Sequence, residues 1–244
     1  MDDICCDKKI FAVSDIHGHA ALLKMELLKH GFVPNSSSHL LVVCGDCFDR
    51  GNESKELFEF LSTLSNKVIV RGNHEEMLMD AIKRECINIS DIYNGTEITI
   101  EDLFGADSID RMGRIHITDD RRKQVLDYLL QTVDYFETQN YVFVHGWIPP
   151  EDWRNASPEA WSDARWMGWT EMYDQYNVKD KILICGHRAA KHAHTMDRSR
   201  TADDNSPYFG GHFIAIDSNT VRSKTINVLV IEDEPYCDEQ DTSQ

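Results

Sequence analysis

The sequence has no apolar run long enough to cross a membrane. A spanning helix needs about 18 consecutive apolar residues, and charged or polar residues interrupt every such stretch in this chain. The opening residues MDDICCDKK also lack the basic-then-apolar order of a secretion signal. Both absences argue against a membrane protein, and we expect a cytoplasmic location.

Positive charge is also scarce. The 25 lysines and arginines are outnumbered by 42 aspartates and glutamates, which gives a formal net charge of −17 at pH 7. Residues 232–244 carry six of the negative charges and no lysine or arginine, and the rest of the chain is still acidic. A protein that binds nucleic acid in bulk needs a basic surface to neutralise phosphates. The composition therefore argues against that class.

A disulfide framework is missing as well. The seven cysteines are odd in number and lack the spacing of a stapled fold, which fits a reducing compartment. Cys44 and Cys185 are expected to be small buried residues of strands. Cys44 and Cys47 form a C-x-x-C pair, but Asp46 between them has another use, so a redox function is the less favoured interpretation.

What the sequence does have is an alternation of strand-like and helix-like patterns. Strand-like runs at 9–13, 39–44 and 67–70 are each followed by a helical pattern, at 20–30, 54–64 and 75–85. Further strands are expected at 141–144, 181–185, 212–216 and 225–231. This order predicts an α/β fold in which helices cover a sheet. We expect one domain over residues 1–231 and a disordered acidic tail over residues 232–244.

Two stretches show no sustained periodicity, residues 86–113 and 146–170, and are expected to be long loops that act as lids or binding loops. The second contains all five tryptophans. They form either a stacking surface for a nucleotide base or a small core under the loop, and the core is favoured. Farther along, His192 and His194 are expected to be solvated rather than to reach a site.

Polar side chains follow five of the predicted strands. They occur in the segments SDIHGH (Asp15, His17), GDCFDRG (Asp46, Asp49, Arg50), RGNHE (Arg71, Asn73, His74), VHG (His145) and CGH (His187). In an α/β sheet, ligands bind at the carboxyl edge, where loops from several strands converge. The sequence therefore predicts one site at this edge.

Six of these residues have the chemistry of metal ligands: Asp15, His17, Asp46, Asn73, His145 and His187. Oxygen and imidazole ligands without thiolate suit Mn²⁺, Fe or Zn²⁺ better than Ca²⁺ or a structural cysteine-bound zinc. Six ligands exceed what one catalytic ion with an open position needs. They would serve two divalent ions that share a carboxylate.

The motifs SDIHG, GDCFDRG, GNHE, VHG and GH, in this order, resemble those of the calcineurin-like metallophosphoesterases, and within them the phosphoprotein phosphatase group. The bacterial and phage serine/threonine phosphatases are the most similar type, with the symmetrical diadenosine tetraphosphatases as siblings. The resemblance implies a sandwich of two mixed β-sheets flanked by helices. The chain departs from the family's usual pattern at Trp147, which follows the motif VHG, and at Arg188, where GHR replaces the commoner GHT.

The resemblance also implies how the six ligands are shared. Asp15 and His17 would hold the first ion, Asp46 would bridge both, and the second would be completed by Asn73, His145 and His187. A water between two such ions loses a proton near neutral pH, and the hydroxide would attack phosphorus in line with the leaving oxygen.

Catalytic and phosphate-binding residues follow in the same way. His74 would be the general acid that protonates the leaving oxygen, and Asp49 would orient it. Arg50 and Arg71 present planar groups suited to phosphate oxygens. Arg165 would be a third phosphate-binding arginine, although the match to the family is loose there.

The leading hypothesis is a serine/threonine protein phosphatase that uses two divalent ions, most simply Mn²⁺, with Fe or Zn²⁺ as alternatives. Its partner would be a phosphorylated protein or a small phosphoester, and the sequence predicts no oligomeric state. The alternative is a hydrolase of dinucleoside polyphosphates or other nucleotide phosphoesters. A more remote alternative is a non-catalytic phosphate-binding scaffold, which would be expected to lack a ligand or the acid.

Overall fold

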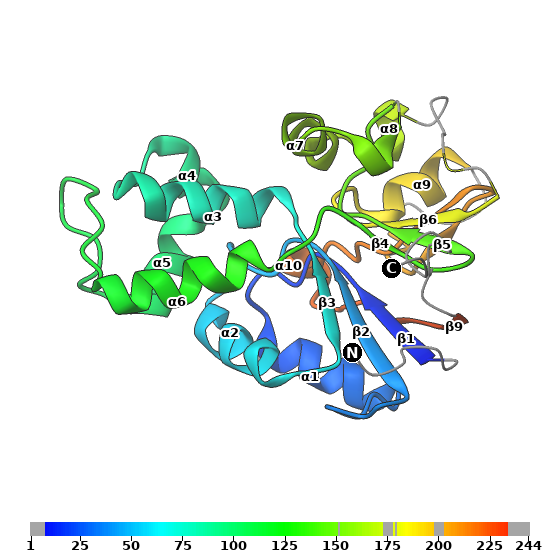
Figure 1. Ribbon diagram of the computed structural model, residues 1–244, viewed down its shortest axis with the longest axis horizontal. Coiled ribbons are helices and arrows are strands. Elements are labelled where there is room, and N and C mark those ends of the chain that lie inside the picture. Colours follow the sequence, from blue (N-terminus) through cyan, green and yellow to red (C-terminus); the bar gives the residue numbers. More distant parts are fainter. Residues whose placement is uncertain (1–7, 151, 173–177, 179, 198–202, 234–244) are drawn as a thin grey trace, which may run out of the picture.

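The computed structural model describes residues 8–150, 152–172, 178, 180–197 and 203–233. Within this part of the chain the strands form two sheets (Figure 1). The first has the order β3-β2-β1-β9 and the second the order β4-β5-β6-β8-β7. Both contain parallel and antiparallel pairs, so the predicted α/β sandwich of two mixed sheets is confirmed.

The first sheet is built around three parallel strands, β1 (Lys8–Val13), β2 (His39–Cys44) and β3 (Lys67–Val70). The last strand, β9 (Leu229–Asp233), pairs antiparallel with β1. In the second sheet β5 (Tyr141–Phe143), β6 (Ile182–Cys185) and β8 (Phe213–Ala215) are parallel. Its edges are the short antiparallel strands β4 (Phe136–Glu137) and β7 (Tyr208–Phe209).

The two sheets pack face to face, and β1 shows how the sequence produces this. Ile10 and Ala12 belong to the apolar cluster that joins the two sheets, whereas Phe11 and Val13 belong to the cluster under the helices. Successive side chains of a strand point to opposite faces. A strand that is apolar on both faces, such as β1, is therefore buried between two layers.

Helices cover the outer face of each sheet (Figure 1). The first sheet packs against α1 (Ala20–Lys29) and α2 (Ser54–Thr63). Helices α3 (Asn73–Arg84), α5 (Thr96–Phe104) and α6 (Asp119–Leu130) lie beside that sheet, where α5 packs on α2 and α3, and α6 packs on α3. The second sheet is covered by α7 (Pro158–Trp166), α8 (Trp169–Met172) and α9 (Ala190–Met196). The remaining elements are α4 (Ile89–Asn94), a 3₁₀ turn at Trp153–Asn155 and α10 (Thr220–Ser223). None of the described helices is long and apolar enough to span a membrane.

The expectation of a long loop over residues 86–113 is wrong for most of its length. Residues 89–104 form α4 and α5, which meet at Gly95. In α5 the buried residues are Thr96, Thr99, Ile100 and Leu103, which is helical spacing. Two of the four are threonines, so counting apolar residues alone hides the pattern.

The second long loop is also partly helical, because α7 and α8 lie within residues 146–170. Ser157 caps α7 by accepting a hydrogen bond from the amide of Ala160 at 3.3 Å, and Pro158 occupies the first turn. The preference for a small tryptophan core is confirmed for four of the five. They are Trp147, Trp153, Trp161 and Trp169.

The strand β9 continues past the expected start of the tail at Glu232. Asp233 is buried, and its carboxylate accepts hydrogen bonds from Thr138 Oγ1 at 2.6 Å and from Asn140. The folded chain therefore extends through Asp233, and the rest of the expected tail, residues 234–244, lies outside the described residues.

Candidate metal centre

The candidate ligands lie just beyond the carboxyl ends of five parallel strands. Asp15 and His17 follow β1, Asp46 follows β2, and Asn73 begins α3 after β3. From the other sheet, His145 follows β5 and His187 follows β6. The site therefore lies where the two sheets meet.

Several of these residues have a left-handed backbone. The φ angles are 49° at Asp15, 48° at His17, 55° at Asp46 and 62° at His187. A residue with a side chain in this region is strained by about 1–3 kcal/mol, and such strain collects at functional sites. The tight turns aim each side chain back across the strand ends, towards the others.

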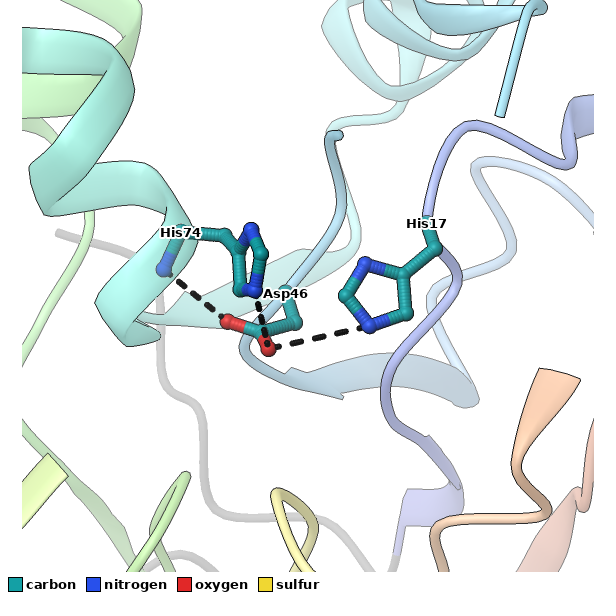
Figure 2. A group of neighbouring side chains, drawn as sticks. All are labelled: His17, Asp46 and His74. Atoms are coloured by element: carbon teal, nitrogen blue, oxygen red, sulfur yellow. Dashed lines mark hydrogen bonds and ion pairs between the residues drawn. The ribbon is translucent and has the colours of Figure 1, made fainter. Parts of the chain in front are cut away.

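The first group of candidate ligands is His17, Asp46 and His74, whose ligand atoms lie within 4.8 Å of one another (Figure 2). His17 donates its Nδ1–H to the carbonyl of Phe48 at 3.0 Å, so Nε2 keeps its lone pair. That nitrogen lies 3.8 Å from Asp46 Oδ2 and 3.9 Å from Asp15 Oδ1. Burial lowers the pKa of His17, as does the charge of His74. A neutral ring is the form that binds a metal, and here the Nε2 lone pair accepts a hydrogen bond from Arg50 at 2.9 Å.

The second group is Asp46, His145 and His187. His145 donates its Nδ1–H to the carbonyl of Cys44 at 2.9 Å, and burial lowers its pKa. Its Nε2 therefore carries a lone pair and no proton. It nevertheless lies 2.9 Å from Asn73 Oδ1 and 3.2 Å from Asp46 Oδ1, two oxygens that also carry lone pairs. Three electron-pair donors converge here, and a cation is what satisfies such an arrangement. The Asn73 oxygen faces this cluster and does not cap α3.

His187 is fixed from two sides. Its backbone N–H donates to Asp15 Oδ2 at 3.0 Å, and its Nε2–H donates to the carbonyl of Trp166 at 3.1 Å. This leaves Nδ1 as the nitrogen with a lone pair. Hydrogen bonds of this kind set the tautomer and the orientation of metal-binding histidines.

Asp46 belongs to both groups. Its Oδ2 faces His17 and His74 (Figure 2), and its Oδ1 faces His145. Burial raises the pKa of Asp46, and the nearby charges of Asp15 and Glu75 raise it further. Buried carboxylates this close together need compensating positive charge. The residues present therefore fit two cations that share Asp46.

Next to this cluster, His74 and Asp49 form a buried pair. The His74 Nδ1–H donates to Asp49 Oδ2 at 2.8 Å. The same carboxylate oxygen accepts from Thr96 Oγ1 at 2.7 Å, and the Asp49 amide donates to Thr99 Oγ1 at 2.9 Å. Helix α5 therefore holds Asp49, and Asp49 holds the His74 ring with its Nε2 towards Asp46.

The three predicted phosphate-binding arginines differ in placement. Arg50 donates to Nε2 of both His17 and His74, at 2.9 Å in each case. Arg71 instead donates to Oγ1 and the carbonyl of Thr132. Arg165 is buried and paired with Glu76 and Asp134. Only Arg50 among the three contacts the candidate ligands in this structure, and the phosphate-binding roles of all three stay predictions.

Sequence reasoning missed Glu75, which organises the turn that carries Asp46. Its buried carboxylate accepts hydrogen bonds from the amides of Asp46 at 2.9 Å, Cys47 at 2.7 Å and Gly72 at 2.8 Å. The signal was available, because an acidic residue three positions after the helix cap is typical of a capping box. Gly72 is required as well, since a Cβ there would lie 2.2 Å from Asp46 Oδ1.

Asp217, after β8, is a second residue that the sequence reading did not single out. It is buried, and burial raises its pKa to about 6. Burial raises the pKa of Asp15, and the charge of Asp217 raises it further. Asp217 therefore adds a further acidic group close to the candidate ligands.

The expectation for His192 and His194 is half right. His192 is exposed. His194 is buried, donates Nε2–H to the carbonyl of Ser206 at 3.0 Å and contacts the Tyr208 ring. It belongs to the packing around α9 rather than to solvent.

Comparisons with known proteins agree with this geometry. A model of the calcineurin-like phosphoesterase family matches residues 8–195. Serine/threonine-protein phosphatase 2 of Salmonella typhimurium is 38% identical over 78 residues, which cover 32% of this chain and 34% of that protein. The chain thus matches about a third of the length of this curated relative.

Solved structures share the fold. A proposed diadenosine tetraphosphatase superposes with a TM-score of 0.58 at 17% identity, covering 92% of this chain and 93% of that one. The cold-active protein-tyrosine phosphatase of a psychrophilic Shewanella has a TM-score of 0.54 at 16% identity, with coverage of 92% and 75%. Identities this low establish the architecture alone. Together with the family match over more than half of the sequence, they show that the chain belongs to the calcineurin-like phosphoesterase family.

Proposed function

We propose that the protein hydrolyses phosphomonoesters with two divalent metal ions, and that its substrates are proteins phosphorylated on serine or threonine. The observation that carries the proposal is the position of Asp46, whose two carboxylate oxygens face two separate groups of candidate ligands. The partial match to a bacterial serine/threonine phosphatase supports the choice of substrate.

In this proposal Asp15, His17 and Asp46 hold one ion, and Asp46 holds the second together with Asn73, His145 and His187. Two bound divalent ions supply Lewis acidity at the phosphoryl group and activate a water as nucleophile. Mn²⁺ is the proposed metal, with Fe or Zn²⁺ as alternatives, because the donors are oxygen and imidazole without thiolate.

The protein's own groups complete the reaction. Arg50 reaches the centre of the cluster with both terminal nitrogens, which donate to Nε2 of His17 and His74 in this structure. With His17 bound to an ion instead, the guanidinium would be able to bind two phosphoryl oxygens at once. His74 is held by Asp49 through Nδ1, so in the protonated ring Nε2–H would be the group that gives a proton to the leaving oxygen. A positioned acid of this kind contributes about 10²–10⁴-fold to the rate.

A second candidate is the hydrolysis of dinucleoside polyphosphates. The observation in its favour is that the likeness to a proposed diadenosine tetraphosphatase covers nearly the whole of both chains. Both reactions need the same metal centre, so they differ only in the groups that surround the phosphate.

The test strips the protein with a chelator, restores Mn²⁺, and compares turnover of a phosphoserine peptide with that of diadenosine tetraphosphate. We expect activity that depends on Mn²⁺ and a higher kcat/KM for the peptide. Asp46→Asn is the control. It should fold, bind less metal by elemental analysis and lose about 100-fold or more in kcat. Preferential turnover of the nucleotide would select the second candidate, and no turnover of either would refute both.

A further inference from the structure

One of the five tryptophans differs from the others in its surroundings. Four are buried in the apolar cluster on the outer face of the second sheet. Trp166, the last residue of α7, is 47% exposed. An indole carries a large, rigid apolar face on which another planar ring can stack.

Trp166 lies at the edge of the candidate metal centre. Its ring centroid is 6.4 Å from that of His187, and the two ring planes are nearly perpendicular, at 85°. His187 shares a ligand group with Asp46 and His145. The Trp166 carbonyl accepts the Nε2–H of His187, so the residue that fixes this histidine also carries the exposed ring.

The ring is free of competing partners within the described part of the chain. The contact with His187 is the one ring contact of Trp166 found there, and no lysine or arginine lies over its face. The neighbouring Arg165 does not cover it, because its guanidinium turns inward to Glu76 and Asp134.

The support of the ring is rigid. Helix α7 is tied to α3 through Glu76, which accepts a hydrogen bond from Ser162 at 3.1 Å and pairs with Arg165. Trp161, on the same helix, is buried in the apolar cluster of the second sheet and donates its Nε1–H to the carbonyl of Trp153 at 3.2 Å. A fixed aromatic face loses little conformational entropy when a flat group stacks on it.

We propose that Trp166 is a stacking surface for a planar aromatic ring carried by the substrate, adjacent to the phosphate-binding position. The inference rests on the proposed function, because it places the phosphoryl group at the metal centre. It adds a substrate class that the serine/threonine proposal does not include, namely phosphoesters with an aromatic ring a few bonds from phosphorus. Such a ring belongs either to a nucleoside phosphate or to an aryl phosphate such as phosphotyrosine. An aliphatic seryl phosphate alone would not use the surface.

The test measures binding of phosphonates that the enzyme cannot hydrolyse, by calorimetry on the Mn²⁺-loaded protein. One arm compares phenylphosphonate with cyclohexylphosphonate, which is similar in size but not planar. The other compares adenosine 5′-(α,β-methylene)diphosphate with methylenediphosphonate. Replacement of an aromatic stacking partner weakens binding of a base by about tenfold, so Trp166→Leu should raise the Kd of the aromatic probe about tenfold. The same variant should leave the Kd of the matched non-aromatic probe within about twofold of the wild-type value.

Two further variants control the result. Trp166→Phe keeps a flat ring and should restore most of the affinity. Tyr93→Ala removes an aromatic ring that is 86% exposed on α4 and should change neither Kd.

Each outcome has one meaning. If Trp166→Leu weakens binding of the adenosine probe alone, the surface binds a nucleobase. If it weakens binding of phenylphosphonate, the surface binds the ring of an aryl ester. Unchanged affinity of both aromatic probes in Trp166→Leu overturns the inference, while turnover of phosphoesters by the same variant leaves the proposed function intact. If the wild-type protein binds none of the four probes, the inference fails, and turnover of the phosphoserine peptide decides the proposed function separately.

Discussion

At the scale of single residues, the candidate site depends on which atom of each histidine keeps its lone pair. His17 and His145 each donate Nδ1–H to a backbone carbonyl and direct Nε2 inward. His187 does the reverse, because its Nε2–H is taken by the carbonyl of Trp166. Backbone carbonyls therefore set all three tautomers, and none of these partners can be recognised in the sequence.

His74 provides a test at this scale. We expect His74→Asn to keep its metal and to slow alkyl phosphates by about 10²–10⁴-fold. Aryl phosphates should be slowed far less, because their leaving groups depart without a proton. Steady-state kinetics over a series of leaving groups, with elemental analysis of the variant, measure both effects. Equal slowing of all substrates would remove His74 from the acid role, and loss of metal would make it a ligand instead.

The set of residues that lie together at the site could be predicted from the sequence. The contacts of several of their side chains could not. Gathering follows from topology, because polar residues after parallel strands must meet at one edge. Contacts depend on distant partners. Arg71 is held by Thr132 and Arg165 by Glu76 and Asp134, and no local pattern indicates these pairings.

At the scale of elements, α4 and α5 form part of the wall of the site rather than a loose lid. Gly95, where they meet, lies so close to Arg50 that a Cβ would be 2.5 Å from the Arg50 amide nitrogen. Thr96 and Thr99 of α5 both hydrogen-bond to Asp49. Helices α1 to α3 and strands β1, β2, β3, β5, β6 and β8 were predicted close to their bounds, since their apolar spacing is regular. The last strand begins at Leu229 rather than at residue 225, and the short edge strands β4 and β7 were not predicted. Helix α5 was missed because its buried face is half threonine.

Thr96→Val tests this role of α5. Valine has the same shape but no hydroxyl, so Asp49 Oδ2 keeps only its bond to His74, and Asp49 Oδ1 already has no partner among the described residues. We expect the free energy of unfolding to fall by about 1–3 kcal/mol, measured by urea denaturation. The kcat for alkyl phosphates should fall more than that for aryl phosphates.

The matched control is Thr63→Val, at the exposed end of α2. It should change the free energy of unfolding by less than about 0.5 kcal/mol. A Thr96→Val protein that matches this control in stability and in kinetics would show that α5 does not position Asp49.

At the scale of the whole molecule, the two sheets are joined by Asp233 as well as by their shared core. The carboxylate on β9 of the first sheet accepts hydrogen bonds from Thr138 Oγ1 and from the amide and side chain of Asn140, which flank the turn between β4 and β5 of the second. The distances are 2.6, 2.9 and 2.7 Å.

Asp233→Ala should lower the free energy of unfolding by about 3 kcal/mol, because three donors lose a charged acceptor. Equilibrium unfolding in urea measures this loss. Asp233→Asn, which retains one acceptor oxygen, should lose less. Removal of residues 234–244 should change stability little, since the sequence predicts a disordered tail there. An alanine variant as stable as the wild type would show that this contact does not join the sheets.

The pairing of β9 with β1 has a consequence for how the protein is made. On the ribosome, Lys8–Val13 emerges well before its antiparallel neighbour Leu229–Asp233, because most of the described chain lies between them. During elongation the edge of β1 that will pair with β9 therefore has unpaired backbone N–H and C=O groups, to which strands of other chains can bind. Completion of this layer must wait until β9 has been synthesised, and long-range pairing of this kind is intrinsically slow.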